Sequence, residues 1–273
     1  MTIRAWLTQH TKLLQEAGIA SARLDCLILL EDALKTNRAL LLAHDTDPIP
    51  APIIRKLNKF VTQRMVHTPL AYIRGHAAFY GRDFLVSPQV LVPRPETEAI
   101  IDILSALPLP AQPKIVDIGT GSGCLGITAN LLLPDSIVTL IDIDPAVLRL
   151  AQKNAQALSA QVTTSINNVL NDYIGPVDVV LANLPYVPDD YAINEAARHE
   201  PKLALFAGKD GLDLYRTMWQ QLAAYSQPVP YVITECLTTQ LDANEALAKD
   251  AGYKLDQTQG LAQLFVQSAV TNQ

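Results

Sequence analysis

A short polar stretch, Asn183-Leu184-Pro185-Tyr186, follows an apolar run in the second half of the chain. An Asn side-chain oxygen beside a backbone carbonyl offers two acceptors, which together can take both hydrogens of a planar NH2 group. The proline favours an extended conformation at Leu184 and so directs its carbonyl, and the tyrosine supplies a flat face. These residues predict a site that holds an amine or amide nitrogen. A simple turn at the end of a strand uses the same residue types and stays open as an alternative.

The run before this stretch, residues 177–182, is apolar and rich in β-branched side chains. That pattern is typical of a strand buried on both faces of a parallel sheet. In open α/β sheets, ligands bind beyond the carboxyl ends of the strands. We therefore expect Asn183, Leu184, Pro185 and Tyr186 to lie at the reactive edge of such a sheet.

A second candidate site begins at Asp117, near the end of a predicted strand over residues 114–118. The segment Gly119-Thr120-Gly121-Ser122-Gly123 follows, and alternate glycines let the backbone turn sharply and approach a ligand at the start of a helix. The next predicted strand ends in Asp142, whose carboxylate could accept both hydroxyls of a ribose. A role for Asp142 as a turn or capping acid is the alternative.

The glycines from Gly121 to Gly126 also spell GxGxxG, so a dinucleotide must be considered. Two features favour S-adenosylmethionine instead. The glycine segment begins at Gly119, two residues before the literal dinucleotide motif, and Asp117 would bring a carboxylate near the ammonium group of that cofactor. The predicted cofactor-binding set is Asp117, Gly119, Thr120, Gly121, Ser122, Gly123, Asp142, Ile143, Asn168 and Asn183.

The elements needed to position these residues alternate between strand and helix, which is the signature of a parallel sheet with crossover helices. We predict strands at 114–118, 137–142, 161–166, 177–182 and 229–235, and helices at 124–133, 145–158, 210–225 and 238–250. Two further strands, at 253–258 and 263–268, are expected to form an antiparallel hairpin.

The preceding part of the chain has a different pattern. Residues 1–73 show apolar residues at helical spacing and predict a small helical domain for substrate docking. Residues 74–113 predict a hairpin, a helix that Pro95 begins, and a proline-rich linker. The remaining residues, 114–273, are expected to form the domain that binds S-adenosylmethionine.

Composition limits the function classes. The 273 residues are 49% hydrophobic and carry a net charge of −6, which offers no general attraction to nucleic acid or to an anionic membrane. The three cysteines form no CxxC pair, and the five scattered histidines suggest no metal site. No apolar run has signal-peptide or membrane-spanning length, so we expect a cytoplasmic protein that binds neither membrane nor nucleic acid directly.

Several longer segments resemble the release factor glutamine methyltransferases, the PrmC/HemK family of class I methyltransferases. They include Leu91-Val-Pro-Arg-Pro-Glu-Thr-Glu98, the stretch from Asp117 to Gly123, the Asn-Leu-Pro-Tyr tetrapeptide, and residues 199–216. The resemblance implies a seven-stranded, mostly parallel sheet with an antiparallel C-terminal hairpin, S-adenosylmethionine as cofactor, and a peptide chain release factor as substrate. It also implies N5-methylation of the glutamine in the Gly-Gly-Gln tripeptide of that factor.

The chain departs from the family pattern at four places. Leu184 stands where the family has proline, and Asn167-Asn168 where it often has aspartate and an aromatic residue. Cys236 follows Glu235 where Glu-Ile-Gly is common, and Gln263 stands in place of an expected arginine. The alternatives are a ribosomal-protein glutamine methyltransferase, an adenine-N6 nucleic-acid methyltransferase, and a degenerate scaffold that binds S-adenosylmethionine without transferring the methyl group.

The predicted reaction is a direct in-line methyl transfer to an amide nitrogen, with no covalent intermediate on the protein. Asn183 and the Leu184 carbonyl would hold the two N–H groups, and Pro185 and Tyr186 would complete the catalytic set. Two acidic residues further on, Glu200 and Asp210, either bind substrate or close a loop.

Overall fold

The computed structural model describes residues 1–268 and divides them into two compact units. One contains Met1–Gly75 together with Ile193–His199, and the other contains His76–Ala192 and the residues from Glu200 onward. No helix of the described residues is long and apolar enough to cross a lipid bilayer.

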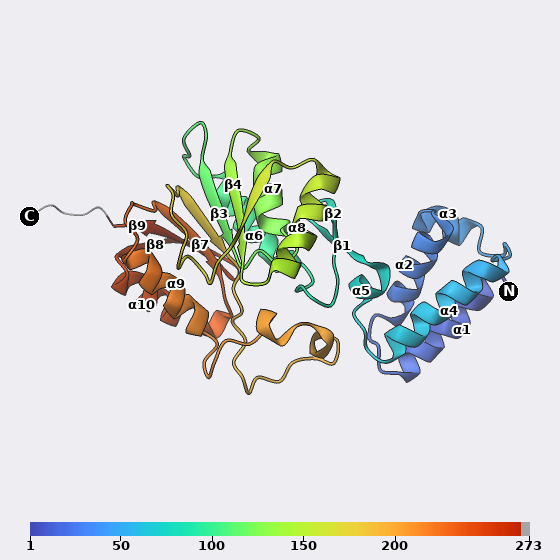
Figure 1. Cartoon of the computed structure of the whole chain (residues 1–273). Coiled ribbons are helices and arrows are strands. Elements are labelled where there is room, and N and C mark those ends of the chain that lie inside the picture. Colours follow the sequence, from blue (N-terminus) through green and yellow to red (C-terminus); the bar gives the residue numbers. More distant parts are fainter. Residues whose placement is uncertain (269–273) are drawn as a thin grey trace, which may run out of the picture. The chain divides into compact units, whose positions relative to one another are not determined.

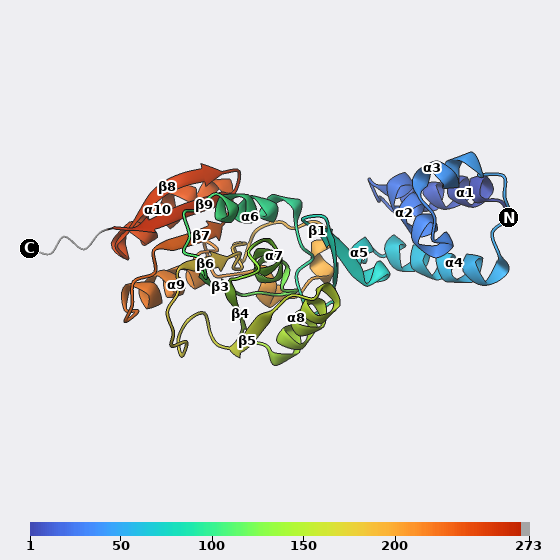
Figure 2. The same cartoon turned by 90° about the horizontal axis from the view of Figure 1, so that it is seen from above.

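The first unit is helical, as its apolar periodicity predicts (Figures 1 and 2). Its core is made by large buried side chains such as Trp6, Leu29 and Leu57. The Asp25 carboxylate and the Arg64 guanidinium form an ion pair of 2.7 Å beside this core. The helices are α1 (Ile3–Glu16), α2 (Ala22–Leu34), α3 (Arg38–Ala43), α4 (Ala51–Met65) and α5 (Leu70–Arg74).

The second unit opens with an antiparallel hairpin, β1 (His76–Phe79) and β2 (Arg82–Leu85). A short 3-10 helix, η1 (Pro95–Thr97), then leads into α6 (Glu98–Ser105), so Pro95 does begin a helical segment. The remaining elements alternate as expected. They are β3 (Lys114–Ile118), α7 (Cys124–Leu132), β4 (Ile137–Asp142), α8 (Pro145–Leu158), β5 (Val162–Ile166), β6 (Val179–Ala182), α9 (Asp213–Ala223), β7 (Tyr231–Glu235), α10 (Leu241–Asp250), β8 (Tyr253–Gln259) and β9 (Ala262–Gln267), with short 3-10 helices at Ala197–His199, Lys202–Ala204 and Thr238–Gln240.

Seven strands form one sheet in the order β5-β4-β3-β6-β7-β9-β8. The first five in this order are parallel, and β9 runs antiparallel to both β7 and β8. The predicted class I methyltransferase sheet with its antiparallel C-terminal hairpin is therefore confirmed. The helices α6, α7 and α8 supply the core on one face, and α9 and α10 supply the core on the other (Figure 1).

The strand order reverses at β3, because the chain passes from β3 to β4 on one side and later returns to β6 on the other. Such a switch point leaves a crevice beyond the carboxyl ends of the two flanking strands. The residues after β3 and β6 are the glycine segment and the stretch that begins at Asn183. The topology thus brings the two predicted sites to the same edge of the sheet.

Candidate active site

A cavity of about 330 Å³ lies beyond the carboxyl ends of β3, β4 and β6. Its volume is at the lower end of the range for small-molecule sites. Every predicted site residue except Gly123 and Tyr186 lines it. The lining consists of Gln89, Val90, Leu91, Pro93, Arg94, Thr97, Asp117, Ile118, Gly119, Thr120, Gly121, Ser122, Cys124, Leu125, Asp142, Ile143, Asp144, Val147, Asn167, Asn168, Val169, Asn183, Leu184, Pro185, Pro201, Leu203, Ala204 and Leu214.

The glycine segment forms the turn between β3 and α7. Its three glycines have positive φ, and a Cβ on Gly119 would approach the Leu184 Cδ2 atom to 3.0 Å. Glycine at that position therefore allows the Leu184 side chain, which is 3% exposed, to pack directly beneath the turn. The Leu184 side chain thus joins the two segments of the site through contact.

Asp117 is buried at the base of the cavity. Its Oδ2 atom accepts hydrogen bonds from the Thr120 hydroxyl at 2.5 Å and from the Gly126 N–H at 2.9 Å. Burial raises the pKa of this carboxyl to about 6, against the opposing effect of these two donors. Both bonds use one oxygen, so the carboxyl supports the turn and also contributes to the cavity wall.

The carboxylate of Asp142 connects the ends of β3 and β4. It accepts hydrogen bonds from the Gly121 N–H at 3.3 Å and from the Asp144 N–H at 3.0 Å. Burial raises its pKa, while these backbone donors lower it. The neighbouring Ile143 is 61% exposed at the cavity rim, where an apolar side chain can cover a planar ring.

The segment after β5 closes another side of the cavity. The Asn167 side chain donates to the Ser165 hydroxyl at 2.7 Å and accepts from the Asp172 N–H at 3.1 Å, so it holds its own loop. Asn168 is exposed at the rim, and Val169 is buried with a φ of +60°. A β-branched residue is rare in this conformation, and such strain gathers at ligand sites.

Asn183 lies at the end of β6 with its side chain oriented by a distant segment. Its Nδ2 atom donates to the Thr97 Oγ1 atom at 2.9 Å. Because the NH2 group is used in this bond, the Oδ1 atom is turned to the opposite side of the amide. The adjacent Leu184 N–H donates to the Tyr215 hydroxyl oxygen at 3.3 Å, which fixes the backbone at this point.

Tyr186 lies behind the cavity wall. Its hydroxyl donates to the Glu235 Oε1 atom at 3.0 Å, and its carbonyl accepts from the Gln240 Nε2 atom at 2.8 Å. Burial and the neighbouring Glu235 carboxyl both raise the pKa of the Tyr186 hydroxyl. The ring therefore supports the Asn183 segment from behind.

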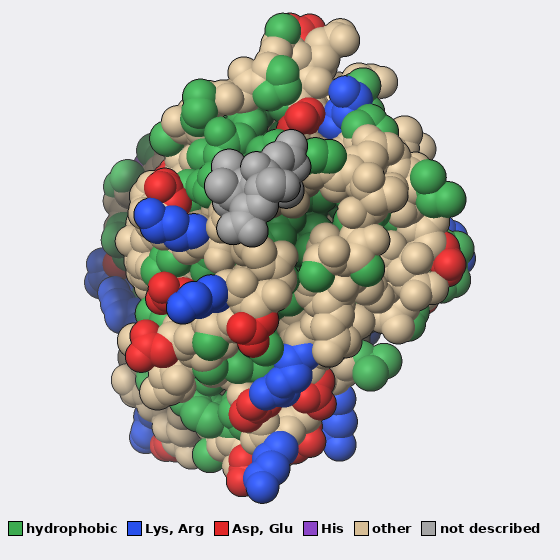
Figure 3. Space-filling model, turned by 90° about the vertical axis from the view of Figure 1, so that its left-hand side faces the viewer, with side chains coloured by type: hydrophobic (Ala, Val, Ile, Leu, Met, Phe, Trp, Pro, Cys, Tyr) green, Lys and Arg blue, Asp and Glu red, His purple; other side chains and the backbone are tan. Residues whose placement is uncertain are grey.

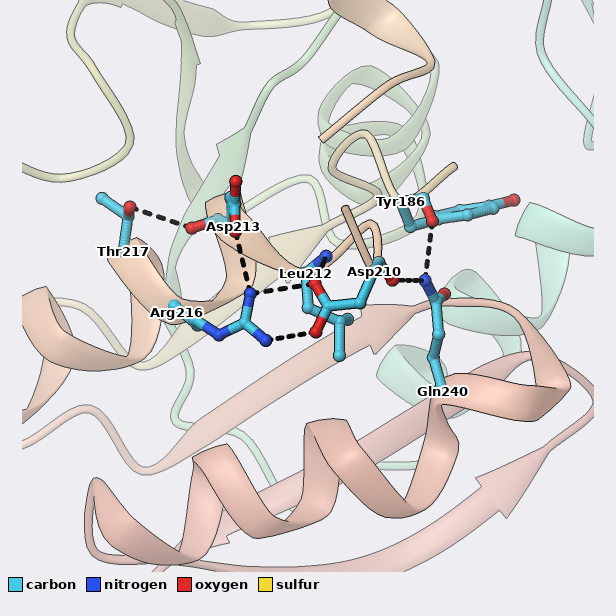
Figure 4. A network of polar contacts seen from close by, with 7 residues as sticks. All are labelled: Tyr186, Asp210, Leu212, Asp213, Arg216, Thr217 and Gln240. Atoms are coloured by element: carbon cyan, nitrogen blue, oxygen red, sulfur yellow. Dashed lines mark hydrogen bonds and ion pairs between the residues drawn. The ribbon is translucent and has the colours of Figure 1, made fainter. Parts of the chain in front are cut away.

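Further contacts hold the loop that follows Tyr186, as Figure 4 shows. The Gln240 Nε2 atom also donates to the Asp210 carbonyl at 2.7 Å. The Arg216 guanidinium pairs with the side chains of Asp210 and Asp213. Of the two predicted roles for Asp210, these contacts match the closing of a loop.

Glu200 ties another segment to the same edge of the sheet. Its carboxylate accepts from the Arg94 guanidinium at 2.5 Å and from the Val92 N–H at 3.1 Å. Since Arg94 and the adjoining Pro201 both line the cavity, this buried carboxylate shapes the wall. Its contacts likewise match loop closure.

Sequence reasoning did not single out Thr97 or Glu235 as parts of the site. Thr97 lies 86 positions from Asn183, and no local pattern reveals that contact. Glu235 carried a usable signal, because it is a carboxylate at the end of an apolar strand, like Asp117 and Asp142. Among the described residues, no cluster of three or more His, Cys, Asp or Glu side chains could hold a metal ion.

Two family models match the chain. The PrmC N-terminal domain matches residues 5–75, and the methyltransferase small domain matches residues 97–201. A release factor glutamine methyltransferase of Koribacter versatilis is 35% identical over 242 residues, with 86% of each chain covered. The protein of the same name from Deinococcus radiodurans is 31% identical over 259 residues, covering 94% of this chain and 93% of that one.

Solved structures support the fold. A methyltransferase of Pyrococcus furiosus superposes with a TM-score of 0.53 at 17% identity, covering 70% of this chain and 91% of that one. At this level of identity the likeness concerns the sheet and its helices alone.

Proposed function

This chain belongs to the family of release factor glutamine methyltransferases, and we propose that Asn183 and the Leu184 carbonyl hold the glutamine nitrogen that it methylates. The chain is an S-adenosylmethionine-dependent protein methyltransferase that acts on the N5 atom of glutamine in release factors. Within that activity, we take the substrate residue to be the glutamine of a Gly-Gly-Gln tripeptide, and the compartment to be the cytoplasm, where translation ends.

The residues of the cavity suit S-adenosylmethionine. Asp142 offers a carboxylate to ribose hydroxyls, Asp117 offers one to an ammonium group, and Ile143 offers an apolar surface to the adenine ring. When bound, the cofactor supplies a methyl group on a positively charged sulfur. We propose that Asp117, Asp142, Ile143, Asn168 and the Gly119–Gly123 segment hold it.

One observation carries the proposal for the substrate nitrogen. The Asn183 Nδ2 atom is bonded to Thr97 inside the protein, which leaves the Oδ1 atom for a ligand in the cavity. An oxygen aimed at an amide N–H group orients the nitrogen and favours the positive charge that develops on it. Holding both N–H groups in a fixed direction contributes several kcal/mol, up to about 7–11 kcal/mol in well-aligned reactions.

The protein therefore needs no nucleophile of its own. The thiol of Cys124, which lines the cavity, is unsuited to that role, because burial raises its pKa to about 12 and keeps it protonated at neutral pH.

The direct test is transfer of a labelled methyl group from S-adenosylmethionine to a purified release factor. We expect label on the wild-type factor and none on a factor whose Gly-Gly-Gln glutamine is replaced by alanine. Label on both factors would contradict the assigned substrate residue. A ribosomal protein fraction included as a third acceptor would reveal the alternative glutamine substrate.

A further inference from the structure

The interior behind Asn183 contains a buried carboxyl group with an unusual set of contacts. Glu235 ends β7 and its residue is 0% exposed. Its Oε1 atom accepts the Tyr186 hydroxyl at 3.0 Å, but its Oε2 atom has no hydrogen-bond partner within the described part of the chain. An unpaired buried polar atom costs free energy, so a role at the neighbouring site offers a reason for its presence.

Among the ion pairs of the described residues none includes Glu235. Arg94, whose charge acts on the adjacent Tyr186 hydroxyl, is paired with Glu200 instead. Burial raises the Glu235 pKa, whereas the side chains of Thr97, Tyr186 and Asn183 lower it, as hydrogen-bond donors do. Of these three side chains, the Tyr186 hydroxyl forms the hydrogen bond to the carboxyl, and Thr97 and Asn183 lie close to it.

These groups have a defined order. The Asn183 Nδ2 atom donates to the Thr97 oxygen at 2.9 Å, and Thr97 is 2% exposed. Because the Thr97 Oγ1 atom accepts this bond, its own hydroxyl hydrogen can be donated to a different acceptor. When it is ionised, the Glu235 carboxylate can only accept, and it then favours the arrangement in which both the Thr97 hydroxyl and the Asn183 NH2 group act as donors.

We propose that Glu235 is a positioning residue, which acts through Thr97 to keep the Asn183 Oδ1 atom turned toward the substrate amide. Reversing the Asn183 amide would present an NH2 group to the NH2 group of glutamine, and two donors cannot bond to each other. This inference rests on the proposed function, because it assigns Oδ1 to the substrate nitrogen.

The test uses the full-length protein with three single variants, Glu235→Gln, Thr97→Val and Thr97→Ser. Glutamine keeps the size of Glu235 but can also donate a hydrogen bond. It therefore no longer requires Thr97 and Asn183 to act as donors. Valine keeps the size of threonine but ends the hydrogen-bond chain, whereas serine retains it. We expect Glu235→Gln and Thr97→Val to lower kcat by about tenfold or more, with Thr97→Ser within about threefold of wild type.

The dissociation constant of S-adenosylmethionine, measured by calorimetry, should change by less than about threefold in all three variants, because none removes a proposed cofactor contact. A double variant, Thr97→Val with Glu235→Gln, should be no slower than the worse single one, since both act through the same amide. Thr139→Val removes a hydroxyl from a buried threonine of β4 outside the cavity, and it should leave kcat unchanged.

Wild-type kcat in folded Glu235→Gln and Thr97→Val would overturn the inference, as would costs that add fully in the double variant. If Glu235→Gln does not fold, the contrast between Thr97→Val and Thr97→Ser decides, and equal kcat values for those two would reject the role. A wild-type protein that transfers no methyl group to the release factor would count against the proposed function. An active wild type with unaffected variants counts against this inference alone.

Discussion

Single residues at this site line the cavity and also support the turn between β3 and α7, and Asp117 is the clearest case. One oxygen of its carboxyl accepts hydrogen bonds from the Thr120 hydroxyl of the glycine turn and from the Gly126 N–H of α7, and burial raises its pKa to about 6 from an ordinary value of 3.8. Between these two values the folded protein keeps a proton that the unfolded chain has lost. The contribution of Asp117 to stability therefore falls as pH rises through this window.

Asp117→Asn removes this titration while its amide oxygen can still accept both bonds. Between pH 4 and 6, the unfolding free energy of the cofactor-free wild type should fall by up to about 3 kcal/mol relative to that of Asp117→Asn. Above pH 6 the difference between the two proteins should change little. Denaturant unfolding at each pH measures the difference, with the exposed Asp256→Asn as a control for the loss of one charge. Parallel stability curves for wild type and Asp117→Asn would contradict the assignment.

Leu184 replaces a proline of the family pattern, and the structure gives the replacement two roles. Its N–H donates to the Tyr215 hydroxyl oxygen, and its side chain packs beneath Gly119. Leu184→Pro removes both, so we expect a loss of about 1–3 kcal/mol in unfolding free energy. Turnover should change by no more than a few-fold, since the carbonyl is retained. A large gain in kcat would instead identify the natural chain as a degenerate scaffold.

At the scale of elements, the parallel strands β3, β4 and β6 were predictable because they are largely buried and consist mainly of apolar residues. Asp117 and Asp142 were predicted as site residues because each lies at or near the carboxyl end of one of these strands. The short helix α5 and the loop after β6 were not predicted, because their residues show no apolar periodicity. The contacts Asn183–Thr97 and Tyr186–Glu235 were also hidden, since tertiary packing brings them together across 86 and 49 positions.

The loop after β6 depends on a close backbone approach at Gly211. Its φ is +77°, and a Cβ there would lie 2.1 Å from the Tyr186 carbonyl oxygen and 2.6 Å from the Gln240 Nε2 atom. Gly252 is a matched control, because its φ is +87° and no atom lies within 4 Å of the corresponding position. Alanine at either position carries the cost of a positive φ. The difference in unfolding free energy between the two variants therefore measures the clash of the added Cβ with Tyr186 and Gln240.

We expect Gly211→Ala to lower the unfolding free energy by about 1–3 kcal/mol more than Gly252→Ala. It should also reduce kcat, because the Tyr186 carbonyl must move. Equal denaturation midpoints and equal kcat values for the two variants would show that the loop adapts without cost.

At the scale of the whole molecule, charge is divided unevenly along the chain. Residues 1–75 contain ten Lys and Arg against six Asp and Glu, whereas the rest contains eleven against twenty-one. On the face of the second unit shown in Figure 3, basic and acidic side chains are interspersed. In the first unit, α4 has no acidic residue and exposes Arg55, Lys56 and Lys59.

We propose that α4 helps the helical unit to dock the release factor. Changing Arg55, Lys56 and Lys59 to Glu together should raise KM for the release factor about tenfold at low salt, with kcat and cofactor affinity unchanged. Added salt should shrink the difference through screening. The paired change Lys249→Glu with Lys254→Glu, in α10 and β8, is the control. An equal effect of both sets would contradict a docking role specific to α4.

The central claim is that Asn183 holds the substrate nitrogen, and Asn183→Ala tests it most directly when transfer and cofactor binding are measured on the same preparation. We predict that methyl transfer to the release factor falls by about 10²–10³-fold. The S-adenosylmethionine dissociation constant should stay within about tenfold of wild type, because most proposed cofactor contacts remain. Transfer at the wild-type rate by Asn183→Ala would contradict the account.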